Sequence, residues 1–362
     1  MFRGIYEGRR VLVTGHSGFK GSWLAAWLLR LGARVCGISL RPGYEPNHYS
    51  LLDLDLESEW SNVRESGEVR SIFADFRPEI VFHLAAQALV RPSYEEPALT
   101  FATNVMGTVN VLEACRETSS VRAVVIVTSD KCYENREWVW GYRENDAMGG
   151  FDPYSASKGC AELVTAAYRR SFFAPETFGK KHSTLVASAR AGNVIGGGDW
   201  AADRLVPDLM RSAAAHREEA LRNPDAVRPW QHVLEPLSGY LQLAGKLYEG
   251  KTEFADAWNF GPAPTAAGTV KEAAAALQRS WPEVRFRAAG DPDAPHEARL
   301  LRLDCSKAQS LLHWHGVWEP ETAFRRTAEW YRDFYLEHKI NTDADFDAYF
   351  DSAAAADMEW MN

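Results

Sequence analysis

The fold of this chain is decided by residues 11–21, which read VLVTGHSGFKG. Val11 to Thr14 predict a short strand, and three glycines spaced G-x-x-G-x-x-G predict a tight loop. The apolar run from Ser22 to Leu31 predicts a helix that ends at Gly32. Such glycines let backbone N–H groups approach a pyrophosphate, which then lies at the positive end of the helix. Strand, glycine loop and helix in this order therefore predict a dinucleotide-binding site.

Outward from this stretch, strand and helix patterns alternate along the chain as far as residue 189. This alternation predicts an α/β fold with a Rossmann-type, doubly wound parallel sheet. The sequence becomes rich in loops after Ala189, which favours a smaller, discontinuous C-terminal substrate domain. We expect a cofactor domain of residues 1–189 plus 229–256 and a substrate domain of residues 190–228 plus 257–362. Beyond Asn341 the acidic, alanine-rich tail predicts a peripheral helix.

Composition excludes several classes of protein. The 362 residues are 46% hydrophobic and 25% charged, as in ordinary soluble globular proteins, and no apolar run reaches the length of a membrane span. Five cysteines without C-x-x-C spacing argue against a disulfide framework and a zinc site, so we expect no metal and a cytoplasmic location. The net charge of −9 argues against a nucleic-acid partner.

The second predicted strand, Arg34 to Leu40, should end at the group that contacts the adenosine ribose. NAD sites usually place an acid there, whereas NADP sites supply an arginine for the 2′-phosphate. This chain has Ser39, Leu40 and Arg41 at that point. We expect NAD, with NADP as the competitor. His16 and Lys20 are expected to add positive charge beside the pyrophosphate.

A candidate catalytic group follows the apolar strand Val121 to Val127. Ser129, Asp130 and Lys131 emerge at the strand end, where open α/β sheets bind ligands. Further on, Tyr154 and Lys158 are four residues apart in a helical context, so the two side chains share one helix face. A nearby ammonium lowers the pKa of a phenol, which makes Tyr154 a candidate base.

Two further sets of residues point to ligand binding. The strand that ends in Leu84, Ala85 and Ala86 has small residues that suit close packing against a flat cofactor ring. Four arginines are scattered along the chain and could together clamp a diphosphate, although each taken singly is better read as a surface residue. These are Arg190, Arg204, Arg228 and Arg299.

With these motifs in place, the chain resembles the extended short-chain dehydrogenases/reductases that modify nucleotide sugars, the NAD-dependent epimerase/dehydratase group. The similarity covers nearly the whole length and is greatest to the 4,6-dehydratase branch that acts on CDP-glucose. It includes the segments 15–23, 128–135, 192–200 and 228–233. Most dehydratases of the group have Thr-Asp-Glu where this chain has Ser129-Asp130-Lys131, so a lysine replaces the usual acid–base glutamate.

The resemblance implies a reaction and the residues that perform it. CDP-glucose loses water across C5 and C6 after its C4 hydroxyl is oxidised through NAD, which yields a 4-keto-6-deoxy sugar for deoxysugar and polysaccharide synthesis. Tyr154 takes the C4 hydroxyl proton, Lys158 holds the phenolate, and a protonated Asp130 donates to the departing C6 hydroxyl. Lys131 is either the base that removes H5, which requires a neutral amine, or a group that stabilises the enolate. The implied binding residues also include Asn104 for the cofactor and Gln87 and Asn193 for the substrate.

Three other functions stay open at this point. An epimerase or decarboxylase of the same fold is expected to lack the Asp130 and Lys131 pair. A net NADPH-dependent reductase, which Arg41 suggests, has no need of that pair. A non-catalytic, redox-sensing module is expected to have lost Tyr154 or Lys158, and both are present.

The same resemblance predicts a homodimer. In this fold the helices that begin near Thr103 and Tyr154 commonly form a four-helix interface. Apolar residues at suitable spacing on these helices are Val105, Val109, Leu112, Leu163, Ala166 and Ala167.

Overall fold

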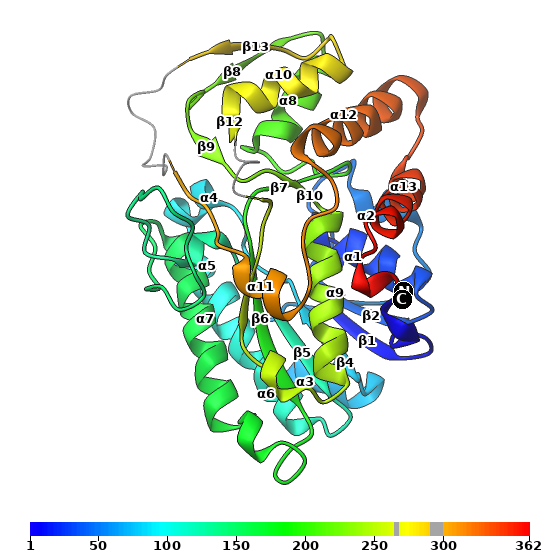
Figure 1. The fold of residues 1–362 in the computed structure, drawn as a ribbon, viewed down its shortest axis with the longest axis vertical. Helices are drawn as coiled ribbons and strands as arrows, with labels where there is room; N and C mark the ends of the chain where they lie inside the picture. Colours follow the sequence, from blue (N-terminus) through cyan, green and yellow to red (C-terminus); the bar gives the residue numbers. More distant parts are fainter. Residues whose placement is uncertain (264–267, 290–299) are drawn as a thin grey trace.

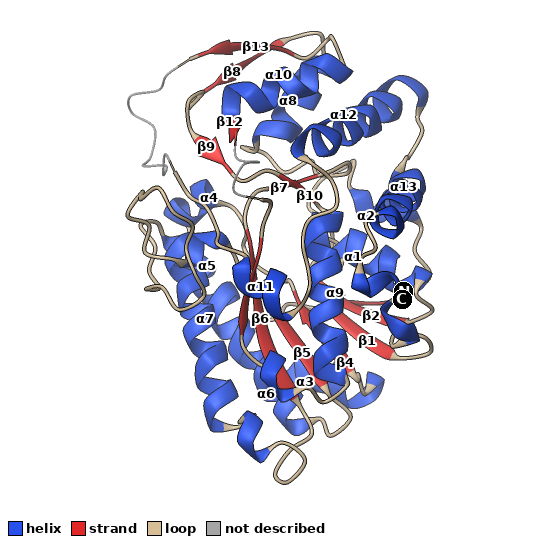
Figure 2. Ribbon diagram, viewed as in Figure 1, coloured by secondary structure: helices blue, strands red, loops and turns tan. Residues whose placement is uncertain are grey.

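A parallel sheet of seven strands forms the centre of the computed structural model, which describes residues 1–263, 268–289 and 300–362 (Figures 1 and 2). The strand order β11-β6-β5-β4-β1-β2-β3 reverses between β1 and β4, as in doubly wound folds. The prediction of a Rossmann-type parallel sheet is therefore confirmed. The strands are β1 (Arg10–Thr14), β2 (Arg34–Ser39), β3 (Glu57–Trp60), β4 (Ile80–His83), β5 (Ala123–Val127), β6 (Leu185–Ala191) and β11 (Ala257–Phe260).

Helices cover both faces of this sheet, because its buried strands are apolar on both sides. Val11 and Val13 of β1 face one core, which also contains side chains of α1 (Phe19–Arg30) and α9 (Leu234–Tyr248). Leu12 faces the opposite core. The helices on that second face are α3 (Ser66–Phe76), α6 (Gly107–Glu117) and α7 (Pro153–Ser171).

A third apolar core lies beyond the carboxyl ends of the strands, in the upper part of Figure 1. It is built around Trp200, Trp230 and Trp281, together with apolar residues of three helices. These helices are α8 (Leu205–Ala214), α10 (Val270–Ser280) and α12 (Pro320–Glu337). Short strand pairs border it: β7 (Val194–Ile195) with β10 (Gln231–His232), β9 (Val227–Arg228) with β12 (Gly268–Thr269), and β8 (Glu218–Leu221) with β13 (Arg285–Ala288).

Two segments differ from the sequence-based division of the chain. Strand β11 pairs with β6, so residues 257–260, which we assigned to the substrate domain, belong to the large sheet. The tail helix α13 (Thr342–Ala355) packs on α1, where Phe346 lies 5.3 Å from Trp23 and 5.7 Å from Trp27, ring centre to ring centre. The tail is therefore part of the core that covers one face of the sheet. The division into two domains otherwise stays a prediction.

The remaining elements are short and connect these layers. They are α2 (His48–Leu52), α4 (Val90–Glu95), α5 (Pro97–Phe101), α11 (Ser306–Leu311), the π-helical turn η2 (Ala102–Met106), and the 3-10 turns η1 (Phe2–Gly4), η3 (Asp130–Cys132), η4 (Pro175–Thr177), η5 (Thr252–Phe254) and η7 (Glu359–Met361). None of the helices in the described ranges is both long and apolar enough to span a bilayer.

Candidate active site

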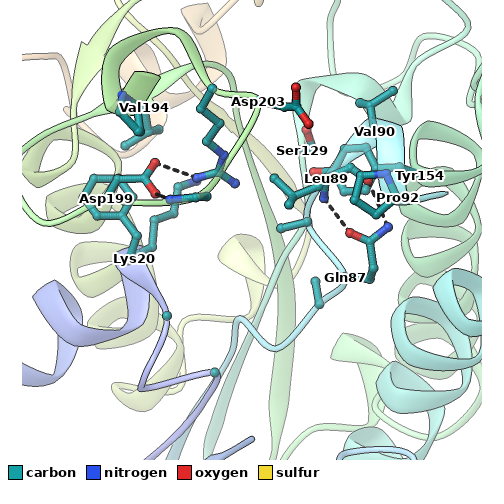
Figure 3. Close-up of a pocket in the computed structure, with 18 of the residues that line it drawn as sticks. Lys20, Gln87, Leu89, Val90, Pro92, Ser129, Tyr154, Val194, Asp199 and Asp203 are labelled. Carbon is teal, nitrogen blue, oxygen red and sulfur yellow. Dashed lines mark hydrogen bonds and ion pairs between the residues drawn. The ribbon is translucent and has the colours of Figure 1, made fainter. Parts of the chain in front are cut away.

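A cavity of about 900 Å³ opens between the carboxyl ends of the sheet strands and the third core. It is lined by the segments that follow β1, β2, β3, β4 and β5 and by residues between 191 and 230. Figure 3 shows Tyr154, Ser129 and Gln87 on one side and Lys20 and Asp199 on the other. The size suits a dinucleotide together with part of a second ligand, because ligand pockets commonly measure roughly 300–1,000 Å³.

The glycine loop after β1 is built for close approach to a ligand. Gly15 has φ +77°, and a Cβ atom there would lie 2.8 Å from the backbone nitrogen of Ala85. A Cβ on Gly21 would lie 2.0 Å from the carbonyl oxygen of Gly15. Larger residues would therefore break the turn at the start of α1. The loop lines the cavity through Gly15, Ser17, Gly18, Phe19, Lys20 and Gly21, and this cradle fits a dinucleotide pyrophosphate.

His16 does not have the role that we expected from the sequence. Its side chain is fully buried and points away from the cavity, where Nε2 lies 3.1 Å from Ser58 Oγ and the ring packs edge-on against Tyr49. Burial lowers its pKa to about 4, so the imidazole is neutral at physiological pH. His16 therefore supplies no positive charge to a pyrophosphate, and it supports the loop from behind.

The residues at the end of β2 lie at the cavity wall, and their contact with a ribose stays a prediction. The strand ends at Ser39, whose Oγ lies 2.7 Å from Ser17 Oγ, and both residues line the cavity. Arg41 also lines it, with its guanidinium 4.8 Å from the centre of the Trp60 ring. Ser61 and Asn62, which follow β3, belong to the same wall, and the sequence analysis missed them. Their position next to β2 is visible only once β3 is known to pair with β2.

Tyr154 and Lys158 lie on α7 with both side chains buried at the cavity. Asp152 caps this helix, since its carboxylate accepts from Ser155 N at 2.9 Å and from Ser155 Oγ at 2.6 Å. Burial raises the pKa of Tyr154 to about 12, although a hydrogen bond with Ser129 and the charge of Arg204 oppose the rise. The expectation of a lowered phenol pKa was therefore wrong. Burial also lowers the pKa of Lys158 to about 8.

Ser129, Asp130 and Lys131 lie beside this pair, as the sequence predicted. Ser129 Oγ donates to Asp130 Oδ1 at 3.0 Å and accepts from Lys131 N at 3.2 Å. Asp130 is 2% exposed, and its Oδ2 has no hydrogen-bond partner among the described residues. Burial raises the pKa of Asp130, while the charge of Lys131 opposes that rise. A buried carboxyl group of this kind can hold a proton and donate it to a leaving group.

Leu84, Ala85, Ala86, Gln87 and Asn193 all line the cavity. The amide of Gln87 is already occupied, since Nε2 donates to Leu89 O and Thr100 Oγ1 and Oε1 accepts from Leu89 N. Asn104 is not brought to the cavity wall. Its Nδ2 donates to Gln87 O at 3.0 Å and to Ser157 Oγ at 2.8 Å, so it ties the loop after β4 to the helix of Tyr154.

The arginines predicted to clamp a diphosphate do not all converge. Arg204 and Arg228 line the cavity, and Arg204 Nη1 forms an ion pair of 2.8 Å with Asp199. Arg190 is 3% exposed and pairs with Glu162 behind the cavity at 2.8 Å, so it is not available to a ligand. Arg299 lies outside the described residues. The sequence analysis missed Asp199 and Arg222, which also line the cavity, because a single acid or arginine in a loop gives no signal.

The site and the fold together define a nucleotide-sugar-modifying member of the extended short-chain dehydrogenases/reductases. The chain belongs to the family described as GDP-mannose 4,6 dehydratase, whose profile matches residues 12–329. It is 49% identical over 332 residues to the CDP-glucose 4,6-dehydratase of Salmonella typhimurium, and the match covers 91% of this chain and 92% of that enzyme. The family resemblance seen in the sequence is thereby confirmed.

Solved structures share the whole architecture. The UDP-glucose 4-epimerase of Thermus thermophilus in complex with NAD superposes with a TM-score of 0.76 at 25% identity, covering 89% of this chain and 99% of that one. The dTDP-glucose 4,6-dehydratase DesIV of Streptomyces venezuelae has a TM-score of 0.75 at 23% identity and covers 90% of this chain and 97% of its own. At 23% identity, the similarity to DesIV shows a shared fold alone.

Proposed function

We propose that this protein is a CDP-glucose 4,6-dehydratase that uses NAD and releases CDP-4-keto-6-deoxyglucose and water. The main support for a dehydratase is the buried carboxyl group of Asp130, which accepts a hydrogen bond from Ser129 in the same cavity as Tyr154. A dehydratase needs an acid for the departing hydroxyl, whereas an epimerase does not. The substrate follows from the 49% identity to an enzyme with that activity.

The first step is oxidation of the sugar at C4. Bound NAD would supply the hydride chemistry, from C4 in the oxidation and back to C6 after water loss, when the base returns a proton to C5, so the cofactor would end as it began. Tyr154 takes the proton of the C4 hydroxyl as the C4–H bond breaks. Because burial raises the pKa of Tyr154 to about 12, this transfer requires positive charge nearby. Lys158 and Arg204 line the same cavity and are placed to supply it.

Water loss follows once C4 is a ketone, since the ketone makes the C5–H bond acidic. The C5 proton leaves to a base, the C5–H electron pair forms the C5–C6 double bond, and Asp130 gives its proton to the departing C6 hydroxyl. The raised pKa of Asp130 favours the protonated acid that this step requires. Lys131 adjoins Asp130 and is placed either to accept the C5 proton or to stabilise the enolate.

The other site assignments form part of the same proposal. The glycine loop, Ser39, Arg41 and the Leu84-Ala85-Ala86 segment hold the cofactor, and Asn193, Arg204 and Arg228 bind the nucleotide sugar. Residues 1–191 and 229–260, together with the tail helix α13, act as the cofactor domain. We also propose a cytoplasmic location, in keeping with five free cysteine thiols.

A homodimer completes the proposal. Leu163 on α7 is 61% exposed and Met106 of the neighbouring turn η2 is 51% exposed, which supports an apolar contact surface there. Leu112 does not belong to this surface, because it is fully buried within the subunit. Sedimentation equilibrium at micromolar concentration should give a dimer, and Leu163→Glu should shift it toward monomer. A wild-type monomer would reject the dimer.

The test of the function is a comparison of CDP-, dTDP-, UDP- and GDP-glucose with purified protein and added NAD, followed by NMR of the sugar. We expect a 4-keto-6-deoxy product, with the highest kcat/KM for CDP-glucose. A product changed only in the configuration at C4 would identify an epimerase instead. Higher kcat/KM with another nucleotide would overturn the substrate assignment.

A further inference from the structure

Two arginines and one aspartate meet where the cavity opens to solvent. Asp203 Oδ1 lies 3.4 Å from Arg91 Nη1 and 3.0 Å from Arg222 Nη1. All three residues line the cavity. Their side chains are between 34% and 43% exposed, whereas Asp130 and Tyr154 are buried. The three charges therefore lie toward the mouth of the cavity and outside the group proposed for catalysis.

Arg91 and Asp203 come from opposite sides of the cavity. Arg91 lies on α4, which follows β4 and packs against α7, the helix of Tyr154. Asp203 lies in the loop between β7 and α8, and Trp200 of this loop belongs to the third core. In Figure 3 Asp203 lies on the side of Val90, the residue before Arg91. The ion pair therefore joins the sheet side of the cavity to the third core.

The position of Asp203 is fixed from its own side of the cavity. Arg222 directly follows β8, which borders the third core, so its contact with Asp203 does not cross the cavity. The backbone of Asp203 has φ +62°, in the left-handed region that aspartate and asparagine tolerate better than most residues other than glycine. Opening of the cavity would therefore break the contact with Arg91 and keep the contact with Arg222.

We propose that the Arg91–Asp203 ion pair is a latch that holds the sugar in the cavity until hydride has returned to C6. This inference rests on the proposed function. Between the two hydride transfers the sugar is a ketone, and its two electrons are held by NADH. If the sugar left at that stage, an oxidised sugar would be lost and the enzyme would keep NADH, which cannot accept another hydride. An enzyme that returns the hydride to the same molecule therefore needs a slow exit for its ligand.

Release of CDP from the purified protein without added cofactor tests the latch. Stopped-flow fluorescence follows it, because Trp230 lines the cavity. Exposed ion pairs contribute little, so Asp203→Asn should release CDP about two- to fivefold faster than wild type, and this difference should vanish at about 0.5 M salt. Asparagine keeps the tolerance for the left-handed backbone. Removal of a negative charge near an anionic nucleotide would by itself slow release, so faster release identifies the latch.

Two further variants separate a latch from independent ligand contacts. In the background of Asp203→Asn, Arg91→Gln should change the release rate by less than about twofold, because the shared contact is already lost. Effects that multiply would overturn the latch, and so would unchanged or slower release in Asp203→Asn. Asp347→Asn is the control, since Asp347 pairs with Arg30 at the same distance of 3.4 Å outside the cavity and should behave as wild type.

Turnover of CDP-glucose with NAD gives a second readout. Asp203→Asn should accumulate enzyme-bound NADH about two- to fivefold faster per turnover than wild type, with an equal amount of oxidised sugar in solution. Absorbance measures the NADH, and NMR identifies the sugar. Equal accumulation in wild type and Asp203→Asn would show that the ion pair does not retain the intermediate, and would overturn the proposal.

Hydrogen exchange in the free protein makes the latch testable apart from the substrate. Arg91→Gln should raise amide exchange in residues 200–204, on the opposite side of the cavity, by about two- to fivefold, as Asp203→Asn should. Unchanged exchange in Arg91→Gln would overturn the latch. If CDP-glucose gave no 4-keto-6-deoxy product with the wild type, the proposed function would be wrong, and this exchange experiment would still decide whether the ion pair holds the cavity closed.

Discussion

Arg190 Nη2 lies 2.8 Å from Glu162 Oε2, and the two side chains are 3% and 4% exposed. The same carboxylate accepts from Ser188 Oγ at 2.7 Å and from the hydroxyl of Thr128, the residue before Ser129. Arg190 also donates to the hydroxyl of Tyr133 at 2.6 Å. The ion pair therefore joins β6 to α7 and to the segment after β5, directly behind the active site.

Removal of Arg190 should destabilise the fold. Arg190→Leu leaves the carboxylate of Glu162 buried without its cation, which costs about 3–5 kcal/mol of the free energy of unfolding. Urea denaturation measures this loss. Arg143→Leu is the control, because Arg143 pairs with Asp304 at an exposed site and should change stability by less than about 1 kcal/mol. Equal effects in the two variants would contradict the structural role of Arg190.

Tyr154→Phe should abolish turnover and leave the fold intact, and so should Lys158→Ala. General acid–base groups contribute about 10²- to 10⁴-fold, so kcat should fall by at least about a hundredfold. Tyr168→Phe removes a hydroxyl from the same helix outside the cavity and serves as the control. Circular dichroism verifies the fold. Turnover of Tyr154→Phe within about tenfold of wild type would exclude Tyr154 as the base.

Asp130→Asn should slow water loss far more than oxidation at C4, because the amide keeps the shape of the side chain and cannot donate an acidic proton. In a single turnover, NADH absorbance should therefore rise and persist. Stopped-flow absorbance with CDP-glucose gives both rates, and Asp146→Asn, outside the cavity, is the matched control. If oxidation and water loss slowed equally, Asp130 would have a positioning role instead.

His48 predicts a pH dependence of stability. The His48 ring is buried, and its nitrogens lie 2.8 Å from Ser22 Oγ and 2.9 Å from Thr342 Oγ1. Burial lowers its pKa from 6.5 to about 3. The contribution of the neutral ring to stability is complete above the unfolded pKa and is lost as the pH falls from about 6.5 toward 3, because only the unfolded chain takes up the proton. At a pH of about 5 the loss is about 2 kcal/mol.

Urea denaturation at two pH values tests this prediction. Between a pH of about 7.5 and about 5, His48→Gln should lose about 2 kcal/mol less stability than wild type. The exposed His315→Gln is the control and should follow wild type. An identical pH dependence in wild type and His48→Gln would show that His48 is not the titrating group.

Local patterns predicted the fold and three parts of the cavity wall, namely the glycine loop, Ser129 to Lys131, and the Tyr154 and Lys158 pair. Long-range contacts decided the roles of several other residues. The glycine loop and the Tyr154 and Lys158 pair depend on spacing within a few residues, which the sequence displays directly. His16 was misjudged because its burial depends on Gly37, Ser58 and Tyr49 of distant segments. Arg190 was misjudged because its partner, Glu162, is a buried acid 28 residues away. Asn62 was missed for the same reason, since its place beside β2 depends on the pairing of β3 with β2.

The last prediction concerns the ribose contact at the end of β2. Ser39 lines the cavity there, and its Oγ bonds the hydroxyl of Ser17 rather than presenting a carboxylate. Ser39→Asp supplies the missing acid for the 2′-hydroxyl, so the affinity for NAD should rise by about tenfold or more, since a hydrogen bond to a charged group contributes about 1.5–3 kcal/mol. NADP should bind more weakly, because the new carboxylate repels the 2′-phosphate. Val139→Asp adds the same charge at a site that is 73% exposed and outside the cavity, and it should change neither affinity.

The wild type should lose NAD during gel filtration and depend on added cofactor. Sub-micromolar retention of NAD by the wild type, or no gain in Ser39→Asp, would show that the ribose is held by other groups.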